Sequence, residues 1–132
     1  MGLPPPFNTF KVEKRAGEYK DFGNVGNAYP LKGVTYPVDY GEIDGYVTED
    51  GAKLDLFVGT SGDVNHFGFI RVSRPDLPDG EHKFYICLTD DEEEAVLQEF
   101  GPALIGNGRY DSFNALLDAI KPFSADSSKL VH

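Results

Sequence analysis

The chain has 132 residues, of which 40% are hydrophobic and 13% aromatic, as is typical of one globular domain with its own core. Its 12 basic and 22 acidic residues give a formal net charge of −10, which argues against nucleic acid or an anionic membrane as a partner. The single cysteine, Cys87, excludes a disulfide framework, and no apolar run reaches the roughly 18 residues of a transmembrane helix. We therefore expect a single cytoplasmic domain over residues 1–132.

The first two thirds of the chain carry the signals of a β-rich fold. Residues 1–8 contain three consecutive prolines and predict an extended arm. Residues 23–33 are rich in Gly, Asn and Pro and predict a loop. Apolar–polar alternation between turns predicts five strands, at residues 10–13, 42–48, 53–59, 66–73 and 81–88. Five strands with short connections indicate a small barrel.

The hydrophobic period changes to a helical one after residue 88. Thr89 followed by Glu92 predicts a capping box at the start of a helix that Gly101-Pro102 ends. A second helix is expected at Ser112–Ile120, where apolar residues recur at helical spacing and Pro122 stops the helix. Residues 124–132 predict a flexible tail. The expected class is therefore α+β, with two C-terminal helices beside the barrel.

Asp55 is the carboxylate whose position most indicates a function, because it lies among Leu54, Leu56, Phe57 and Val58. A charge in such a run costs several kcal/mol unless a cation or hydrogen bonds compensate it. Asp50 lies on the turn before it, and the turn at residues 75–81 holds three more acids, Asp76, Asp79 and Glu81. If the two turns face each other, their carboxylates form a site for Mg²⁺ or Mn²⁺; otherwise they are solvated turn residues.

Other catalytic and metal-binding motifs do not fit the sequence. Three histidines and one cysteine match no zinc-site spacing, and an EF-hand around Asp50-Gly51 lacks its ligands. No Gly-x-Ser-x-Gly elbow, Walker loop or dinucleotide fingerprint occurs. The acidic run at residues 90–94 is explained by a helix N-terminus that faces solvent.

Residues 36–58, YPVDYGEIDGYVTEDGAKLDLFV, resemble the signature of the soluble, family I inorganic pyrophosphatases. That signature is Tyr-Pro-x-Asn-Tyr-Gly-x-Ile, followed about eight residues later by Asp-Gly-Asp-Pro-x-Asp, and its spacing is kept here without a gap. The resemblance covers roughly residues 10–88. It implies a short, divergent member with a five-stranded, OB-like twisted barrel and flanking helices. It also implies Mg²⁺-dependent (or Mn²⁺-dependent) hydrolysis of inorganic diphosphate to phosphate, and a possible homo-oligomer.

The resemblance assigns roles to seven residues. As catalytic groups it implies Asp55, Tyr40 and Lys83, and as phosphate-binding groups Lys11, Tyr40 and Lys83. As metal ligands it implies Asp50, Asp55, Asp76 and Glu81. Glu81 stands where the family has an aspartate, and the strand Phe10-Lys11-Val12-Glu13 is similar to the family's Lys-x-Glu strand.

The chain departs from the family pattern at Ala52-Lys53, where the family has Asp-Pro. The missing aspartate is the one that helps to hold and deprotonate the attacking water. No arginine occurs in residues 21–35, where the family has a phosphate-binding one, and Arg109-Tyr110 is the candidate substitute for its C-terminal Tyr-Lys pair. The sequence thus predicts a pyrophosphatase that is slow or retuned to another diphosphate. The alternatives are a non-catalytic domain of the same fold for metal or anion binding or assembly, or a structural domain whose acids never converge.

Overall fold

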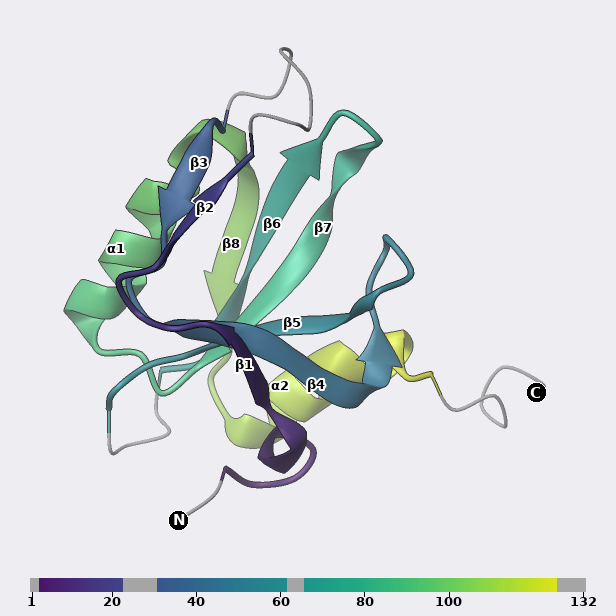
Figure 1. Cartoon of the computed structure of the whole chain (residues 1–132). Helices are drawn as coiled ribbons and strands as arrows, with labels where there is room; N and C mark the ends of the chain where they lie inside the picture. Colours follow the sequence, from purple (N-terminus) through teal and green to yellow (C-terminus); the bar gives the residue numbers. More distant parts are fainter. Residues whose placement is uncertain (1–2, 23–30, 62–65, 126–132) are drawn as a thin grey trace.

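The computed structural model describes residues 3–22, 31–61 and 66–125, and it confirms the α+β class. Six strands form one sheet in the spatial order β1-β4-β5-β7-β6-β8 (Figure 1). The bounds of these strands are β1 Lys11–Lys14, β4 Asp39–Val47, β5 Lys53–Val58, β6 Gly68–Arg74, β7 Leu77–Ile86 and β8 Leu104–Arg109. All pairs are antiparallel except β5 with β7, which are parallel.

The predicted barrel is not confirmed, because the sheet is open in the part of the chain that the structure describes. Its two edge strands, β1 and β8, are not paired with each other. The five predicted strands correspond to β1, β4, β5, β7 and β6. The sequence did not predict β8, whose residues LIGNGR include two glycines and no clear alternation. This strand forms because its backbone pairs with β6 from Gly68 to Val72.

A second, two-stranded sheet was also not predicted. It is a hairpin of β2 (Tyr19–Asp21) and β3 (Gly33–Thr35), so the loop predicted at residues 23–33 ends in a strand. Residues 23–30 of that loop lie outside the described part. Each strand has only three residues, too few to show a hydrophobic period. The hairpin is held by burial of Val34 and by the Thr35 N–H, which donates to the Glu99 carboxylate at 2.9 Å.

Both predicted helices are present. Helix α1 covers Asp90–Glu99, and its capping box between Thr89 and Glu92 is formed as expected. A 3-10 turn that contains Gly101-Pro102 follows it. Helix α2 covers Phe113–Ile120, and the hydroxyl of Ser112 caps it by accepting from the Ala115 N–H. Neither helix, nor any other in the described ranges, combines the length and apolar character needed to cross a membrane.

The chain ends pack more closely than the sequence suggested. Residues 3–9 are not an extended arm, because Phe7–Thr9 form a 3-10 turn in which the Phe7 side chain is fully buried. Its ring lies 5.9 Å from the ring of Phe113 on α2. In the predicted tail, the Ala125 N–H donates to the Gly45 carbonyl at 2.8 Å, and residues 126–132 lie outside the described part. An apolar side chain in a proline-rich stretch carries no periodic signal, so its burial is decided by tertiary contacts.

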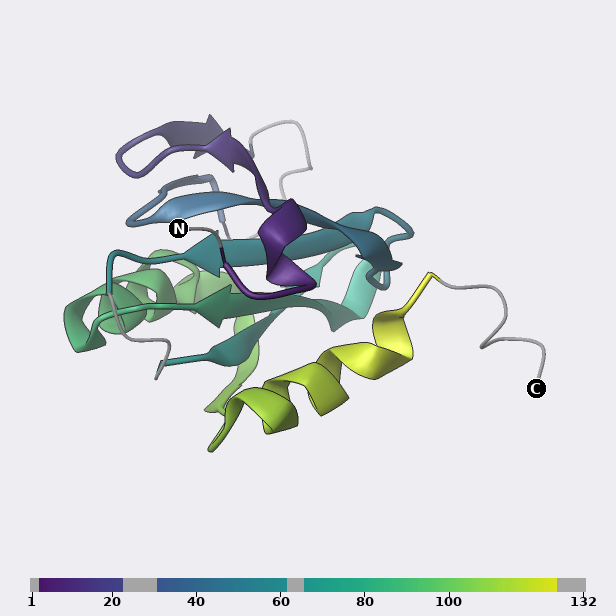
Figure 2. The same ribbon diagram turned by 90° about the horizontal axis from the view of Figure 1, so that it is seen from below.

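The main sheet separates two apolar cores. The first lies between the sheet, α1 and the β2–β3 hairpin, and it contains Val34, Tyr36, Phe57 and Phe100. The second lies against the opposite face, under α2 and the N-terminal turn. Figure 2 shows α2 lying along one side of the sheet. The sheet is thus covered on both faces, and the first face leaves a charged region beyond its aromatic core.

Replacing Phe7 with alanine is expected to lower the free energy of unfolding by about 3 kcal/mol or more, because it empties a fully buried aromatic position. Denaturant unfolding of the native chain and of Phe7→Ala measures this difference. Phe7→Leu, which keeps most of the apolar volume, is the matched control and should lose less. A loss below about 1 kcal/mol for Phe7→Ala would show that the N-terminal turn contributes little to stability.

Candidate functional site

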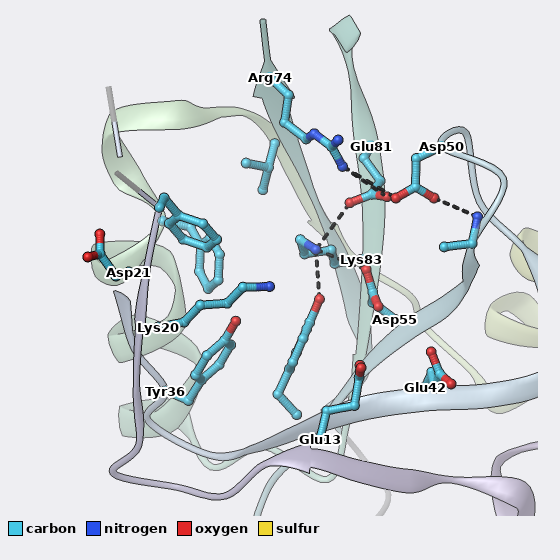
Figure 3. Close-up of a pocket in the computed structure, with 15 residues that line it drawn as sticks. Glu13, Lys20, Asp21, Tyr36, Glu42, Asp50, Asp55, Arg74, Glu81 and Lys83 are labelled. Atoms are coloured by element: carbon cyan, nitrogen blue, oxygen red, sulfur yellow. Dashed lines mark hydrogen bonds and ion pairs between the residues drawn. The ribbon is translucent and has the colours of Figure 1, made fainter. Parts of the chain in front are cut away.

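A pocket of about 420 Å³ lies between the hairpin β2–β3 and the first face of the main sheet (Figure 3). Aromatic rings, among them those of Tyr36, Tyr40 and Phe100, form one part of its wall. Charged groups form the rest. Six carboxylates line it, from Glu13, Asp21, Glu42, Asp50, Asp55 and Glu81, together with three cations, from Lys20, Arg74 and Lys83.

Lys83 on β7 is at the centre of the charged part. Its ammonium donates to the Tyr40 hydroxyl at 2.8 Å, to the Asp55 carboxylate at 3.0 Å and to the Glu81 carboxylate at 3.1 Å. The Lys83 side chain is 13% exposed and that of Asp55 is 16% exposed. Asp55, the acid that the sequence places in an apolar run, is therefore compensated by a nearly buried cation. Asp55 and Lys83 come from adjacent strands, β5 and β7, which the fold pairs in parallel.

A second group of contacts joins Asp50 to Glu81. The hydroxyl of Thr48 lies 3.1 Å from Asp50 Oδ1 and 3.3 Å from Glu81 Oε2. The Ala52 N–H donates to Asp50 at 2.9 Å, which fixes that carboxylate on the β4–β5 turn. The Arg74 guanidinium lies 3.3 Å from the other oxygen of Asp50. The β4–β5 turn and strand β7 thus bring these two acids together.

The pKa values of the two acids are shifted in opposite directions. Burial raises the pKa of Glu81 to about 7, against the opposing effect of Lys83 and with help from its hydrogen bond to Asp50. Burial also acts to raise the pKa of Asp50, but hydrogen bonds from Glu81, the Ala52 N–H and Thr48 lower it to about 2. Asp50 is therefore ionised at neutral pH, while Glu81 takes up a proton near pH 7.

Tyr40 and Lys83 keep their protons at neutral pH. Burial raises the pKa of the Tyr40 hydroxyl well above its usual range, although the Lys83 charge opposes the shift. For Lys83, burial acts to lower the pKa, but Tyr40, Asp55 and Glu81 raise it well above the ordinary value. Since Lys83 donates to the Tyr40 oxygen, the Tyr40 O–H remains able to donate to a ligand.

Three carboxylates of the pocket come from the adjacent strands β1, β4 and β5. Glu42 on β4 is directly opposite Asp55 on β5, a cross-strand pairing of like charges. Glu13 on β1 is close enough that burial, first, and then the charges of Glu42 and Asp55 raise its pKa. Figure 3 shows these three side chains on neighbouring strands. Neighbouring carboxylates that raise the pKa of Glu13 are neutralised by a bound cation.

Of the seven residues that the sequence singled out, five line the pocket: Tyr40, Asp50, Asp55, Glu81 and Lys83. The structure places Asp76 and Lys11 elsewhere. Asp76 is 62% exposed on the β6–β7 turn, where the Arg74 guanidinium holds both of its oxygens, at 3.1 Å and 2.8 Å. Lys11 begins the edge strand β1 and is exposed outside the pocket lining. Sequence spacing gave the right strands here, but not the directions of these two side chains.

Four further charged residues of the pocket were missed: Lys20, Asp21, Glu42 and Arg74. The pairing of Glu42 with Asp55 does not follow from the β4–β5 turn, because the register shifts between Val47, which is opposite Lys53, and Glu42. The proposed substitute Arg109 does not line the pocket. It lies on β8, where its guanidinium donates to the carboxylates of Glu93 and Asp90 on α1.

The donor set of the pocket suits a hard divalent cation, since it consists of carboxylate oxygens in excess over cations. However, residues 3–22, 31–61 and 66–125 contain no group of three or more His, Cys, Asp or Glu side chains already gathered for a metal ion. Instead, Lys83 and Arg74 form ion pairs with the acids that the sequence predicted as ligands. Among the pocket acids, Glu13 has a pKa that burial, and then the charges of Glu42 and Asp55, raise, so a cation beside these three acids is favoured.

Comparisons with known proteins add no assignment. No family model, curated protein or solved structure matches the chain.

The raised pKa of Glu81 predicts a pH dependence of stability. Because its folded-state value of about 7 lies above the ordinary 4.5, the folded chain binds this proton more tightly than the unfolded chain. The resulting stabilisation is complete below pH about 4.5 and is lost as the pH rises through about 7. Between pH 5 and pH 8 the native chain should thus lose on the order of 2 kcal/mol of unfolding free energy that Glu81→Gln does not lose.

Denaturant unfolding at pH 5 and pH 8, in the presence of a chelator, measures this difference. Glu94→Gln removes an exposed carboxylate from α1 and is the matched control, which should follow the native chain. Equal pH dependence in the native chain and in Glu81→Gln would contradict the raised pKa.

Proposed function

We propose that the chain hydrolyses inorganic diphosphate to phosphate in a Mg²⁺-dependent reaction of the pyrophosphatase type. The single observation that supports this proposal most is the composition of the pocket. Tyr40, Asp50, Asp55, Glu81 and Lys83, five of the seven residues to which the resemblance gives a role, line one cavity. They come from β4, β5, β7 and the β4–β5 turn, so their convergence is not a consequence of sequence proximity.

The charge of the pocket supports a substrate that arrives with a cation. Its six carboxylates outnumber its three cations, so a bare diphosphate anion is repelled. In this proposal Glu13, Glu42 and Asp55, with Asp50 and Glu81 beside them, are the residues that hold Mg²⁺ or Mn²⁺. When bound, such an ion neutralises phosphate charge and makes the attacking water more acidic.

The protonation states of the pocket assign tasks to the remaining groups. Lys83 keeps its charge, so it acts electrostatically on a phosphate oxygen and not as a proton donor. The Tyr40 hydroxyl accepts from Lys83 and offers its own proton as a hydrogen-bond donor to the same phosphate. Asp55 holds the Lys83 ammonium in place from the β5 side. These groups position the diphosphate and stabilise its developing charge.

A second candidate function is binding of a metal ion or anion without turnover. Ala52 favours it, because Ala52 lines the pocket beside Asp50 and offers no carboxylate to hold or deprotonate water. The ion pairs of Lys83 and Arg74 favour it too, since they balance much of the charge of the site without a metal. In this case the fold serves binding or assembly.

The first test is the release of phosphate from inorganic diphosphate with Mg²⁺. The native chain should release phosphate, a chelator should abolish the release, and Asp55→Asn should lower kcat/KM by about 10²–10⁴-fold. Asp44→Asn is the matched control, because Asp44 is a 65%-exposed acid of β4 that pairs with Lys53 outside the pocket. Its activity should equal that of the native chain.

Either of two results would contradict the proposal. If the native chain releases no phosphate with Mg²⁺ or Mn²⁺, the pyrophosphatase reaction is excluded and the binding function takes its place. If Asp55→Asn and Asp44→Asn lose activity equally, the pocket described above is not the active site.

Ala52→Asp should raise the rate of phosphate release by about 10-fold or more, because it places a carboxylate at the position where the family has its water-holding aspartate. The same assay measures this gain. Ala52→Asn has nearly the same size without the charge, and it should show no gain. A rate that Ala52→Asp leaves unchanged or lowers would mean that the Ala52 position does not contact the attacking water.

A further inference from the structure

Lys20 differs from the other two cations of the pocket, since Lys83 and Arg74 are each bound by carboxylates of the sheet and its turns. Among the residues that the structure describes, Lys20 has no such carboxylate partner in an ion pair, although its charge opposes the rise in the pKa of Glu13. Its ammonium lies 5.4 Å from the centroid of the Phe22 ring. Figure 3 shows the Lys20 side chain reaching from β2 into the pocket. The pocket therefore contains one cation whose charge is available to an anionic ligand.

The register of the hairpin explains why Lys20 points inward. Lys20 is directly opposite Val34 on β3, and directly opposed residues of an antiparallel pair project from the same face. Val34 is 1% exposed and belongs to the first core, so that face is the one turned toward the sheet. Lys20 is nevertheless exposed, because the space beneath it is the pocket.

The hairpin holds this lysine in a defined place. The Gly17 N–H donates to the Tyr36 carbonyl at 2.7 Å, and the Tyr36 N–H donates to the Glu18 carbonyl at 2.9 Å. These bonds continue the pairing of β2 with β3 beyond Thr35. The Thr35 N–H in turn donates to Glu99 at the end of α1. Both strands are thus tied to the core on which the aromatic wall of the pocket rests.

We propose that Lys20 binds a phosphate group of the diphosphate substrate and determines the affinity of the site for it. This inference rests on the proposed function for the identity of the substrate. It gives Lys20 the task that the resemblance gives to Lys11 and to an arginine that residues 21–35 lack. An ammonium offers three donors and a full charge, which suits a terminal phosphate. Because Lys20 is exposed, its replacement removes no core packing.

Binding of methylenediphosphonate, a diphosphate analogue that resists hydrolysis, tests this role by calorimetry in the presence of Mg²⁺. Lys20→Met should weaken binding by about 10–100-fold, the usual effect of losing a charge-assisted hydrogen bond. Lys20→Arg keeps the charge and should restore affinity to within a few-fold. Lys53→Met is the matched control, since Lys53 pairs with Asp44 outside the pocket, and it should bind as the native chain does.

Some outcomes overturn the role of Lys20. The role is excluded if Lys20→Met binds methylenediphosphonate with an affinity within two-fold of the native chain. It is also excluded if Lys11→Met is the only variant that loses affinity. Equal losses in Lys20→Met and Lys53→Met show an effect of net charge and exclude it as well.

The proposed function fails separately. Binding that depends on Lys20, with no phosphate release from diphosphate, supports the Lys20 site and overturns hydrolysis only. Phosphate release with an unchanged KM in Lys20→Met supports hydrolysis and overturns the Lys20 site only.

Discussion

The nearly buried ammonium of Lys83 is the interaction on which both the sheet and the pocket depend. It joins β7 to Tyr40 of β4 and to Asp55 of β5, and it also contacts Glu81 on its own strand. A buried charge that loses its partners is strongly destabilising, so these three groups and the ammonium require one another. A slip of β7 by one residue turns Lys83 toward the second core, among apolar side chains. The register of the sheet and the geometry of the site are therefore a single constraint.

The sequence predicted the elements that carry their own local signal. The five strands bounded by turns and the two capped helices are present because their periods and caps are local properties. The hairpin β2–β3, strand β8 and the burial of Phe7 were missed because each depends on a distant partner: α1, β6 and α2 respectively. Barrel closure is also a long-range property. Strand patterns alone do not state whether two edge strands meet, and here β1 and β8 do not pair.

The same division applies to the site. Tyr40, Asp55, Glu81 and Lys83 were singled out by the resemblance, and alternation along the paired strands β4, β5 and β7 places them on one face. Asp76 was misplaced because a turn residue has no fixed direction, and Arg74, two positions before it, binds it outside the pocket. Lys20 carried no signal, since β2 has only three residues and its partner strand follows after a loop. The ion pairs that Lys83 and Arg74 form with these acids were likewise not readable from composition.

The parallel pairing of β5 with β7 has a consequence for how the chain folds. The edge of β5 that pairs with β7 stays unpaired until β6 and β7 have been synthesised. The edge of β6 that pairs with β8 stays unpaired until β8, which follows α1 in the chain, has been synthesised. In such non-local pairing, the entropy of closing long loops is lost before the stabilising contacts form. Folding is therefore expected in the range of roughly milliseconds to seconds. On the ribosome, the first four strands leave the tunnel with an unpaired edge and an uncovered apolar face. At that stage, before β7 is synthesised, the partly folded chain is open to chaperone binding. This exposure follows from the topology of the sheet and not from the stability of the folded protein.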